Sequence, residues 1–159
     1  MLIGVVSDTH GQTDYTLEAL NLLDALEVDV VLHCGDVGSP DVVKLFCGRP
    51  THFVLGNVDH GPTIRRACLD AGLSYHERFA AVELGGSKIA VAHGDDLKIL
   101  NTAIESGEYD LVCTGHTHVP KQERRGKTLV LNPGALYRAT PHTLAIVRLP
   151  EVEAEILRV

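Results

Sequence analysis

The chain has 159 residues, of which 45% are hydrophobic and 22% charged, a balance typical of a globular domain with its own core. Its formal net charge of -7 disfavours a basic binding surface, so we expect no long nucleic acid as a partner. No apolar run approaches the roughly 20 residues that a membrane-spanning helix needs, so no membrane partner is expected either.

The N-terminus and the cysteines indicate the cellular compartment. The chain enters an apolar run with no basic segment before it, so we expect no signal peptide. Its four cysteines show no CxxC spacing, which favours reduced, mostly buried thiols. We therefore predict a cytoplasmic protein. Because no linker, repeat or low-complexity tract interrupts residues 1–159, we also predict a single domain.

The first half of the chain alternates short apolar runs, typical of buried strands, with helical patterns. In the first helical pattern, Leu17, Leu20 and Leu23 are expected to form the inward stripe. Ser39 and Pro40 suit the N-cap and first turn of the second helix. We predict strands over residues 2–7, 29–34 and 52–55, and helices over residues 14–26, 40–46 and 62–71.

The second half of the chain shows mainly strand patterns. Gly85-Gly86-Ser87 joins two apolar runs as a hairpin turn. The change from alternating strands and helices to hairpins predicts an α/β protein in which two sheets pack face to face, with helices outside. We predict strands over residues 80–84, 88–92, 110–114, 128–132, 143–149 and 152–159, and a helix over residues 96–106.

Side chains that bind metal ions follow five of the predicted strands. In extended backbone, residues i and i+2 project to the same side, so Asp8 with His10, and His116 with His118, can each face one point. One zinc ion needs about four ligands, whereas seven candidates suit two ions that share a bridging ligand. The seven candidates are Asp8, His10, Asp36, Asn57, His93, His116 and His118.

Each candidate also has an ordinary structural explanation. A lone histidine at a strand end is more often a hydrogen-bonded structural residue, and Asp8 or Asp36 alone would more often cap a turn or a helix. The joint pattern favours a metal site, because every candidate follows a strand and each motif carries its own glycine. Nitrogen and oxygen ligands without thiolate favour manganese, iron, zinc or nickel.

Five short motifs contain these candidates. They are Asp8-x-His10, Gly35-Asp36, Gly56-Asn57-x-Asp59, His93-Gly94 and Gly115-His116-Thr117-His118. Together they resemble the motif set of the calcineurin-like metallophosphoesterases. The length of the chain, its N-terminal Ser7-Asp8-Thr9-His10-Gly11 and its late Asn132-Pro133-Gly134 resemble the small bacterial and archaeal phosphodiesterase branch. The resemblance implies a four-layer α/β/β/α sandwich of two mixed β-sheets.

The resemblance also implies a reaction and its cofactors. Two divalent metal ions are implied, with manganese expected first and nickel, iron or zinc as alternatives. A hydroxide that bridges the two ions would attack the phosphorus of a small phosphodiester, so we expect a metal-dependent phosphodiesterase. The implied ligands are Asp8, His10 and His118 for the first ion, Asn57, His93 and His116 for the second, and Asp36 as the bridge.

One motif departs from the family pattern. Many members carry a histidine that is thought to protonate the leaving group, but here Val58 stands in its place and cannot transfer a proton. His60 is either the alternative acid or a solvated residue at a helix start. Asp59 is expected to orient a neighbouring ligand. Asn57 and Arg138 are expected to contact substrate, although Arg138 could equally be a surface residue. The expected catalytic set is Asp36, Asn57, Asp59 and His60.

The remaining histidines match none of the motifs. His33 is out of register with the residues at its strand end, so it is expected to point away from the metal ions and to be buried and hydrogen-bonded. His52 and His76 are expected at the surface, and His142 is expected to be structural or exposed.

Two other functions share the same motifs. The first is a phosphomonoesterase acting on a small metabolite or a phosphoprotein. The second is a non-catalytic scaffold, because a retromer subunit has this fold; the intact set of ligands argues against it. The resemblance further implies a homodimer or homotetramer, for which residues 152–159 would offer an edge strand.

Overall fold

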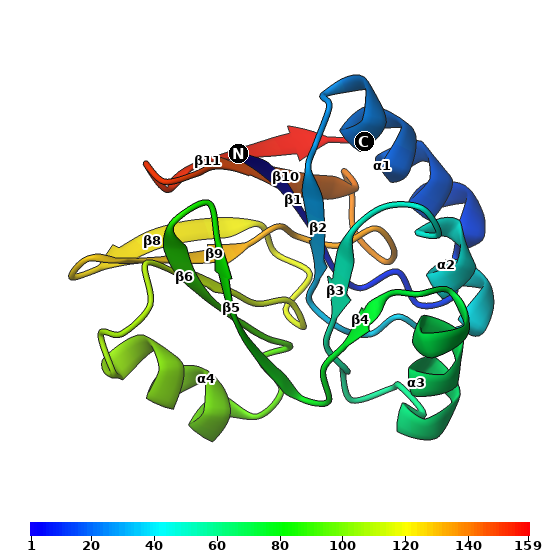
Figure 1. The fold of residues 1–159 in the computed structure, drawn as a ribbon, viewed down its shortest axis with the longest axis horizontal. Helices are drawn as coiled ribbons and strands as arrows, with labels where there is room; N and C mark the ends of the chain where they lie inside the picture. The colour runs from blue at the N-terminus through cyan, green and yellow to red at the C-terminus, as the bar shows by residue number, and fades with distance from the viewer.

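A computed structural model describes residues 1–159 and contains two β-sheets that pack face to face (Figure 1). The first sheet has six strands in the order β11-β10-β1-β2-β3-β4. Its central strands β1, β2 and β3 are parallel, and β10 and β11 add antiparallel strands at one edge. The strands are β1 (Leu2–Val6), β2 (Val30–His33), β3 (Thr51–Phe53), β4 (Ser74–Tyr75), β10 (Thr143–Arg148) and β11 (Glu153–Arg158).

Three helices cover the outer face of the first sheet: α1 (Thr13–Ala25), α2 (Pro40–Leu45) and α3 (Gly61–Asp70) (Figure 1). As predicted, Ser39 caps α2, because its Oγ accepts a hydrogen bond from the Val42 N–H at 3.3 Å. The predicted stripe of α1 is wrong at Leu17, which is 48% exposed.

The second sheet has five strands in the order β5-β6-β7-β9-β8, and α4 (Leu97–Glu105) packs on its outer face. The strands β6, β7 and β9 are parallel, while β5 and β8 are antiparallel to their neighbours. The bounds are β5 (Phe79–Leu84), β6 (Ser87–Ala92), β7 (Leu111–Cys113), β8 (Lys121–Arg125) and β9 (Thr128–Asn132).

The predicted α/β/β/α sandwich of two mixed sheets is confirmed. Its central core lies between the sheets, where residues such as Ile3 and Leu32 face Ile89 and Leu111. Two strands were not predicted, β4 and β8. The sequence of β8 is Lys-Gln-Glu-Arg-Arg, which lacks apolar alternation and becomes a strand only by pairing with β9. None of the helices has the length and apolar character that crossing a membrane requires.

Candidate metal centre

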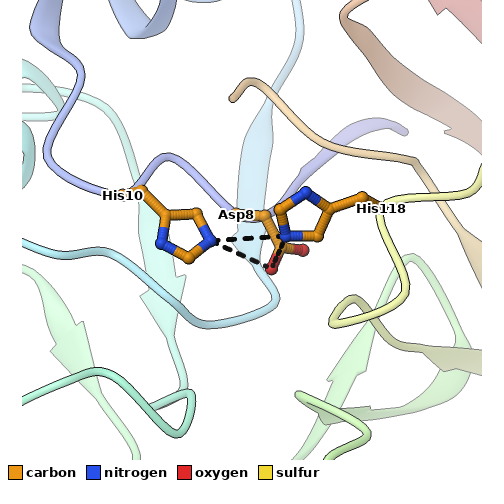
Figure 2. Close-up of side chains that lie close together, drawn as sticks. All are labelled: Asp8, His10 and His118. Carbon is orange, nitrogen blue, oxygen red and sulfur yellow. Dashed lines mark hydrogen bonds and ion pairs between the residues drawn. The ribbon is translucent and has the colours of Figure 1, made fainter. Parts of the chain in front are cut away.

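The ends of β1 and β7 bring together Asp8, His10 and His118 (Figure 2). His118 Nε2 lies 3.2 Å from Asp8 Oδ1, and His10 Nε2 lies 3.7 Å from the same oxygen. The two Nε2 atoms are 3.3 Å apart. Figure 2 shows both rings turned toward the carboxylate from opposite sides. The three donor atoms therefore converge on one point. The extended backbone assumed for the i and i+2 spacing is wrong, because Asp8, His10 and His118 have φ angles of 56°, 46° and 58°.

The Asp8 carboxylate is held so that only one oxygen faces this point. Its Oδ2 accepts hydrogen bonds from Ser7 Oγ at 2.6 Å and from the His116 N–H at 3.1 Å. Its Oδ1 is buried and has no hydrogen-bond partner. A Cβ on Gly115 would lie 2.7 Å from Asp8 Oδ2, so only glycine lets the β7 loop approach this closely.

A second cluster forms where β2 and β6 end, at Asp36 and His93. Asp36 Oδ2 lies 3.3 Å from His93 Nε2 and 3.5 Å from His10 Nε2, so this oxygen stands between the two clusters. Asp36 Oδ1 accepts a hydrogen bond from the Val58 N–H at 3.1 Å. Asp8 Oδ1 lies 4.0 Å from His93 Nε2 and so belongs to both clusters.

His93 is oriented by a bond across the two sheets. Its Nδ1 lies 2.8 Å from the Cys34 carbonyl oxygen. Because a carbonyl only accepts, Nδ1 carries the proton, and Nε2 presents a lone pair to the cluster when the ring is neutral. Nε2 is buried and has no hydrogen-bond partner.

The charges of Asp36 and His93 are coupled. Burial disfavours the charged carboxylate of Asp36, but His93, the Val58 N–H and His10 together outweigh burial and lower the pKa of Asp36. Burial likewise disfavours a charged His93, but the carboxylates of Asp36 and Asp8 and the Cys34 carbonyl together outweigh burial and raise the pKa of His93 above its ordinary value. The protein thus concentrates negative charge where the histidine nitrogens converge, which favours a bound cation.

The other two candidate ligands lie at the rim of this cluster. The His116 ring packs edge-on against the His93 ring, with 5.1 Å between centroids, and the residue is exposed. Asn57 is also exposed and follows β3, one residue before Val58, whose N–H binds Asp36. Five of the seven candidates therefore converge closely, while Asn57 and His116 stand beside them.

Asp59 acts as a clamp between two loops. Its Oδ2 accepts hydrogen bonds from the Gly56 N–H at 2.9 Å and the Val37 N–H at 3.1 Å, and its Oδ1 accepts one from the Gly38 N–H at 2.8 Å. These bonds join the loop that carries Asn57 to the loop that carries Asp36. The expected orienting role of Asp59 thus has a structural basis, although the bonds run to backbone rather than to a ligand side chain.

Asn132 supports the β7 loop, and the predicted turn at Pro133 lies beside it. Asn132 Nδ2 donates to the Gly115 carbonyl at 2.7 Å and to Thr117 Oγ1 at 3.1 Å, while its Oδ1 accepts from the Gly134 N–H at 2.9 Å. These bonds fix Thr117, the residue between His116 and His118.

Farther along this segment, Tyr137 reaches the candidate site. Its ring lies 5.9 Å from the ring of His10. The guanidinium of Arg138 lies over the Tyr137 ring, 5.4 Å from its centroid, and the Arg138 carbonyl oxygen is 3.4 Å from His118 Nδ1. Arg138 is exposed and borders the site. Tyr137 was not predicted from the sequence, because this residue lies outside all of the recognised motifs.

The remaining histidines take several environments. His60 is the N-cap residue of α3, exposed, with Nδ1 2.7 Å from Thr63 Oγ1. His33 is buried and hydrogen-bonded, as predicted. The surface prediction for His52 and His76 is wrong, because both are half-buried and their ring nitrogens lie 3.0 Å apart. His142 packs against Tyr15, with 4.3 Å between ring centroids.

The chemistry of this arrangement fits divalent metal ions. Buried polar atoms almost always have partners, yet Asp8 Oδ1 and His93 Nε2 have none and both face the cluster. The donors are carboxylate oxygens and imidazole nitrogens, with no thiolate among them, a set that suits manganese, iron, nickel or zinc. Secondary hydrogen bonds fix the orientation of Asp8, Asp36 and His93, as metal ligands commonly require.

Comparison with known proteins identifies the class. The family model described as the calcineurin-like phosphoesterase superfamily domain matches residues 1–153. The chain belongs to this superfamily. A relative from Methanocaldococcus jannaschii named as a phosphodiesterase is 34% identical over 142 residues, covering 84% of this chain and 83% of the relative. A probable metallophosphoesterase from Methanothermobacter thermautotrophicus is 29% identical, covering 99% and 92%.

Solved structures agree with this assignment. The structure of an archaeal phosphodiesterase superimposes with a TM-score of 0.92 at 30% identity, with both chains covered completely. Vps29 from Entamoeba histolytica, solved with zinc, superimposes with a TM-score of 0.70 at 21% identity, covering 100% of this chain and 98% of Vps29. The second likeness shows the fold alone.

Proposed function

We propose that this protein is a phosphodiesterase that depends on two divalent metal ions. The observation that carries the proposal is the pair of adjoining clusters joined by Asp36, in which Asp8 Oδ1 and His93 Nε2 lack protein partners. Membership of the phosphoesterase superfamily and the relative named as a phosphodiesterase give the reaction class. A small phosphoester is the substrate that we propose, and the charge of -7 argues against long nucleic acids.

We propose a division of the ligands between two ions. Asp8, His10 and His118 would hold one ion, and His93, His116 and Asn57 the other, with Asp36 between them. We propose manganese as the native metal, with nickel, iron or zinc as alternatives. When bound, such ions neutralise the charge of a phosphate and lower the pKa of water, so that hydroxide is available near neutral pH.

The other residues of the site would bind substrate and transfer protons. Arg138 is the proposed phosphate contact, because its exposed guanidinium borders the site next to Tyr137. Asn57, exposed after β3, is the second. His60 is the proposed proton donor to the leaving group. The alternative is that His60 only shapes the start of α3, and its contact with Thr63 supports that alternative.

The test is hydrolysis of bis(p-nitrophenyl) phosphate by protein that has been stripped with a chelator and reloaded with Mn²⁺. Turnover is expected to follow metal loading and to disappear in Asp36→Ala and His118→Ala. Matched controls are Asp41→Ala, at an exposed position of α2, and His142→Ala, at a residue that packs against Tyr15; both should keep wild-type turnover. Metal-loaded protein that hydrolyses no diester would refute the proposal. Turnover of p-nitrophenyl phosphate alone would instead establish the phosphomonoesterase.

Assembly and location are proposed on separate grounds. We propose a homodimer or homotetramer, supported by the edge position of β11, whose free side is available to a second copy. A cytoplasmic location is supported by four cysteines that form no disulfide, three of them buried. Light scattering of the purified protein would measure the assembly directly, and a monomer at all concentrations would exclude it.

A further inference from the structure

His33 ends β2 on the face of the sheet that points away from the clusters, toward the helices. It is fully buried. Its ring stacks on Phe53, with 5.1 Å between centroids, and meets Phe46 edge-on at 5.8 Å. A phenylalanine would fill such a site without the cost of burying two polar nitrogens. The presence of an imidazole therefore calls for an explanation by its hydrogen bonds.

Both nitrogens of His33 are used, and the bonds define one tautomer. The Gly35 N–H donates to Nδ1 at 3.2 Å, so Nδ1 is unprotonated. Nε2 then carries the hydrogen and donates to Thr9 Oγ1 at 3.0 Å. The Thr9 hydroxyl in turn donates to the Val37 carbonyl at 3.0 Å. Burial lowers the pKa of His33 to about 3, so the ring stays neutral and this chain of bonds stays intact.

These bonds connect the loop that carries Asp8 and His10 to the loop that carries Asp36. Thr9 stands between Asp8 and His10, and Gly35 and Val37 flank Asp36. Backbone bonds already join the loops, from the Asp8 N–H to the Gly35 carbonyl at 3.0 Å and from the His10 N–H to the Asp36 carbonyl at 2.9 Å. The side-chain bonds of His33 and Thr9 add a second set of links between the same loops, on the side that faces the helices.

The loops need such support because of their backbone. Asp8, His10 and Asp36 have φ angles of 56°, 46° and 52°, in the left-handed region that residues other than glycine seldom adopt. A strained conformation persists only where surrounding bonds determine it. The His33 network supplies bonds at the residues between and beside these three ligands.

We propose that His33, acting through Thr9, is a positioning residue that sets the distance between the Asp8/His10 pair and Asp36. The inference rests on the proposed metal-dependent function. It predicts that His33 affects metal binding although its side chain is not a ligand.

The test compares Mn²⁺ affinity by calorimetric titration, at neutral pH and well below the unfolding temperature. His33→Phe keeps the aromatic packing and removes both hydrogen bonds. We expect its Mn²⁺ affinity to fall by about tenfold or more, the effect usual for residues that orient metal ligands. The titration reads metal binding directly, so it does not depend on turnover. If wild type bound Mn²⁺ but hydrolysed nothing, the proposed function would fail while the positioning test still gave its answer.

Thr9 offers a matched pair that leaves His33 and its aromatic packing unchanged. Thr9→Val keeps the shape of the side chain and removes the hydroxyl, whereas Thr9→Ser keeps the hydroxyl. Thr9→Val should weaken Mn²⁺ binding about as much as His33→Phe, and Thr9→Ser should restore it. Because His33 is proposed to act through its bond to Thr9, the double variant should lose little more than either single variant.

His52→Phe is the control for losing a half-buried histidine away from the clusters. It breaks the bond to His76, so it should lower the unfolding temperature and leave Mn²⁺ affinity unchanged. The inference is overturned if His33→Phe behaves in the same way. Should His33→Phe fail to fold, equal Mn²⁺ affinities of Thr9→Val and Thr9→Ser would overturn it instead.

Discussion

Gly56 lies directly against the Asp36 carboxylate: a Cβ added to Gly56 would meet Asp36 Oδ1 and would lie only 2.7 Å from its Cγ. The loops after β2 and β3 can approach each other only because one of them carries no side chain at this point. The position of the central carboxylate therefore depends on a glycine that binds nothing itself.

Gly56→Ala is expected to displace Asp36 and to abolish metal-dependent turnover. The added methyl group cannot be accommodated by a flexible side chain, because it also meets the Asp36 backbone nitrogen. Diester hydrolysis and Mn²⁺ titration would measure the effect. Gly126→Ala is the control: nothing lies near its Cβ, but its φ of 60° costs roughly 1–2 kcal/mol for alanine. It should lose stability and keep activity; wild-type activity in Gly56→Ala would contradict the prediction.

Asp59→Ala should loosen the loops that carry Asp36 and Asn57. Three backbone N–H groups would lose their acceptor at once. We expect kcat to fall by about 10–100-fold, the range typical when a residue that orients ligands is removed. Asp59→Asn should not rescue the activity, because an amide has one acceptor oxygen and, in either orientation, at least one of the three N–H groups would face its NH2 group. Steady-state kinetics that showed full activity in Asp59→Asn would rule out the clamp.

His118 and His116 are expected to affect different ions. His118 faces Asp8 and His10, whereas His116 packs against His93. In Mn²⁺ titrations, His118→Ala should weaken one of the two binding events, and His116→Ala should weaken the other. In each variant the binding event that is not weakened should keep its wild-type affinity. Electron paramagnetic resonance should show spin-coupled manganese pairs in wild type only. Loss of the same binding event in both variants would refute the division of ligands.

The buried His33 predicts a dependence of stability on pH. Its pKa falls from 6.5 to about 3 on folding, chiefly through burial and then through the charge of His93. Between these values the unfolded chain binds more protons, so the contribution to stability is complete above the ordinary pKa and is lost as the pH falls toward 3. The slope is at most about 1.4 kcal/mol per pH unit.

Urea unfolding of the metal-free protein at several acidic pH values would measure this dependence. His33→Phe cannot take up a proton, so its free energy of unfolding should fall less steeply with decreasing pH than that of wild type. Other groups that titrate in this range, including His52 and His76, are present in both proteins and cancel in the comparison. Identical slopes would mean that His33 does not remain neutral in the folded protein.

The sequence alone determined the order of the main strands and helices, because buried parallel strands appear as short apolar runs and amphipathic helices as a repeating stripe. It also determined which side chains follow the strands. The carboxyl ends of parallel strands meet at one edge of a sheet, so Asp8 and Asp36 could be grouped from their positions in the chain. His93 follows β6 of the other sheet, and the packing of the two sheets brings it to them.

Only the tertiary structure decided how these side chains are held. Three contacts show this: the clamp at Asp59, the close approach at Gly56 and the bonds of His33. Each joins segments that lie far apart in the sequence, often through backbone atoms, and no local sequence pattern encodes such contacts. The polar strand β8 was missed for the same reason, since its partner β9 supplies the hydrogen bonds that make it a strand. Local periodicity reports burial, whereas the geometry of a site is set by contacts between distant segments.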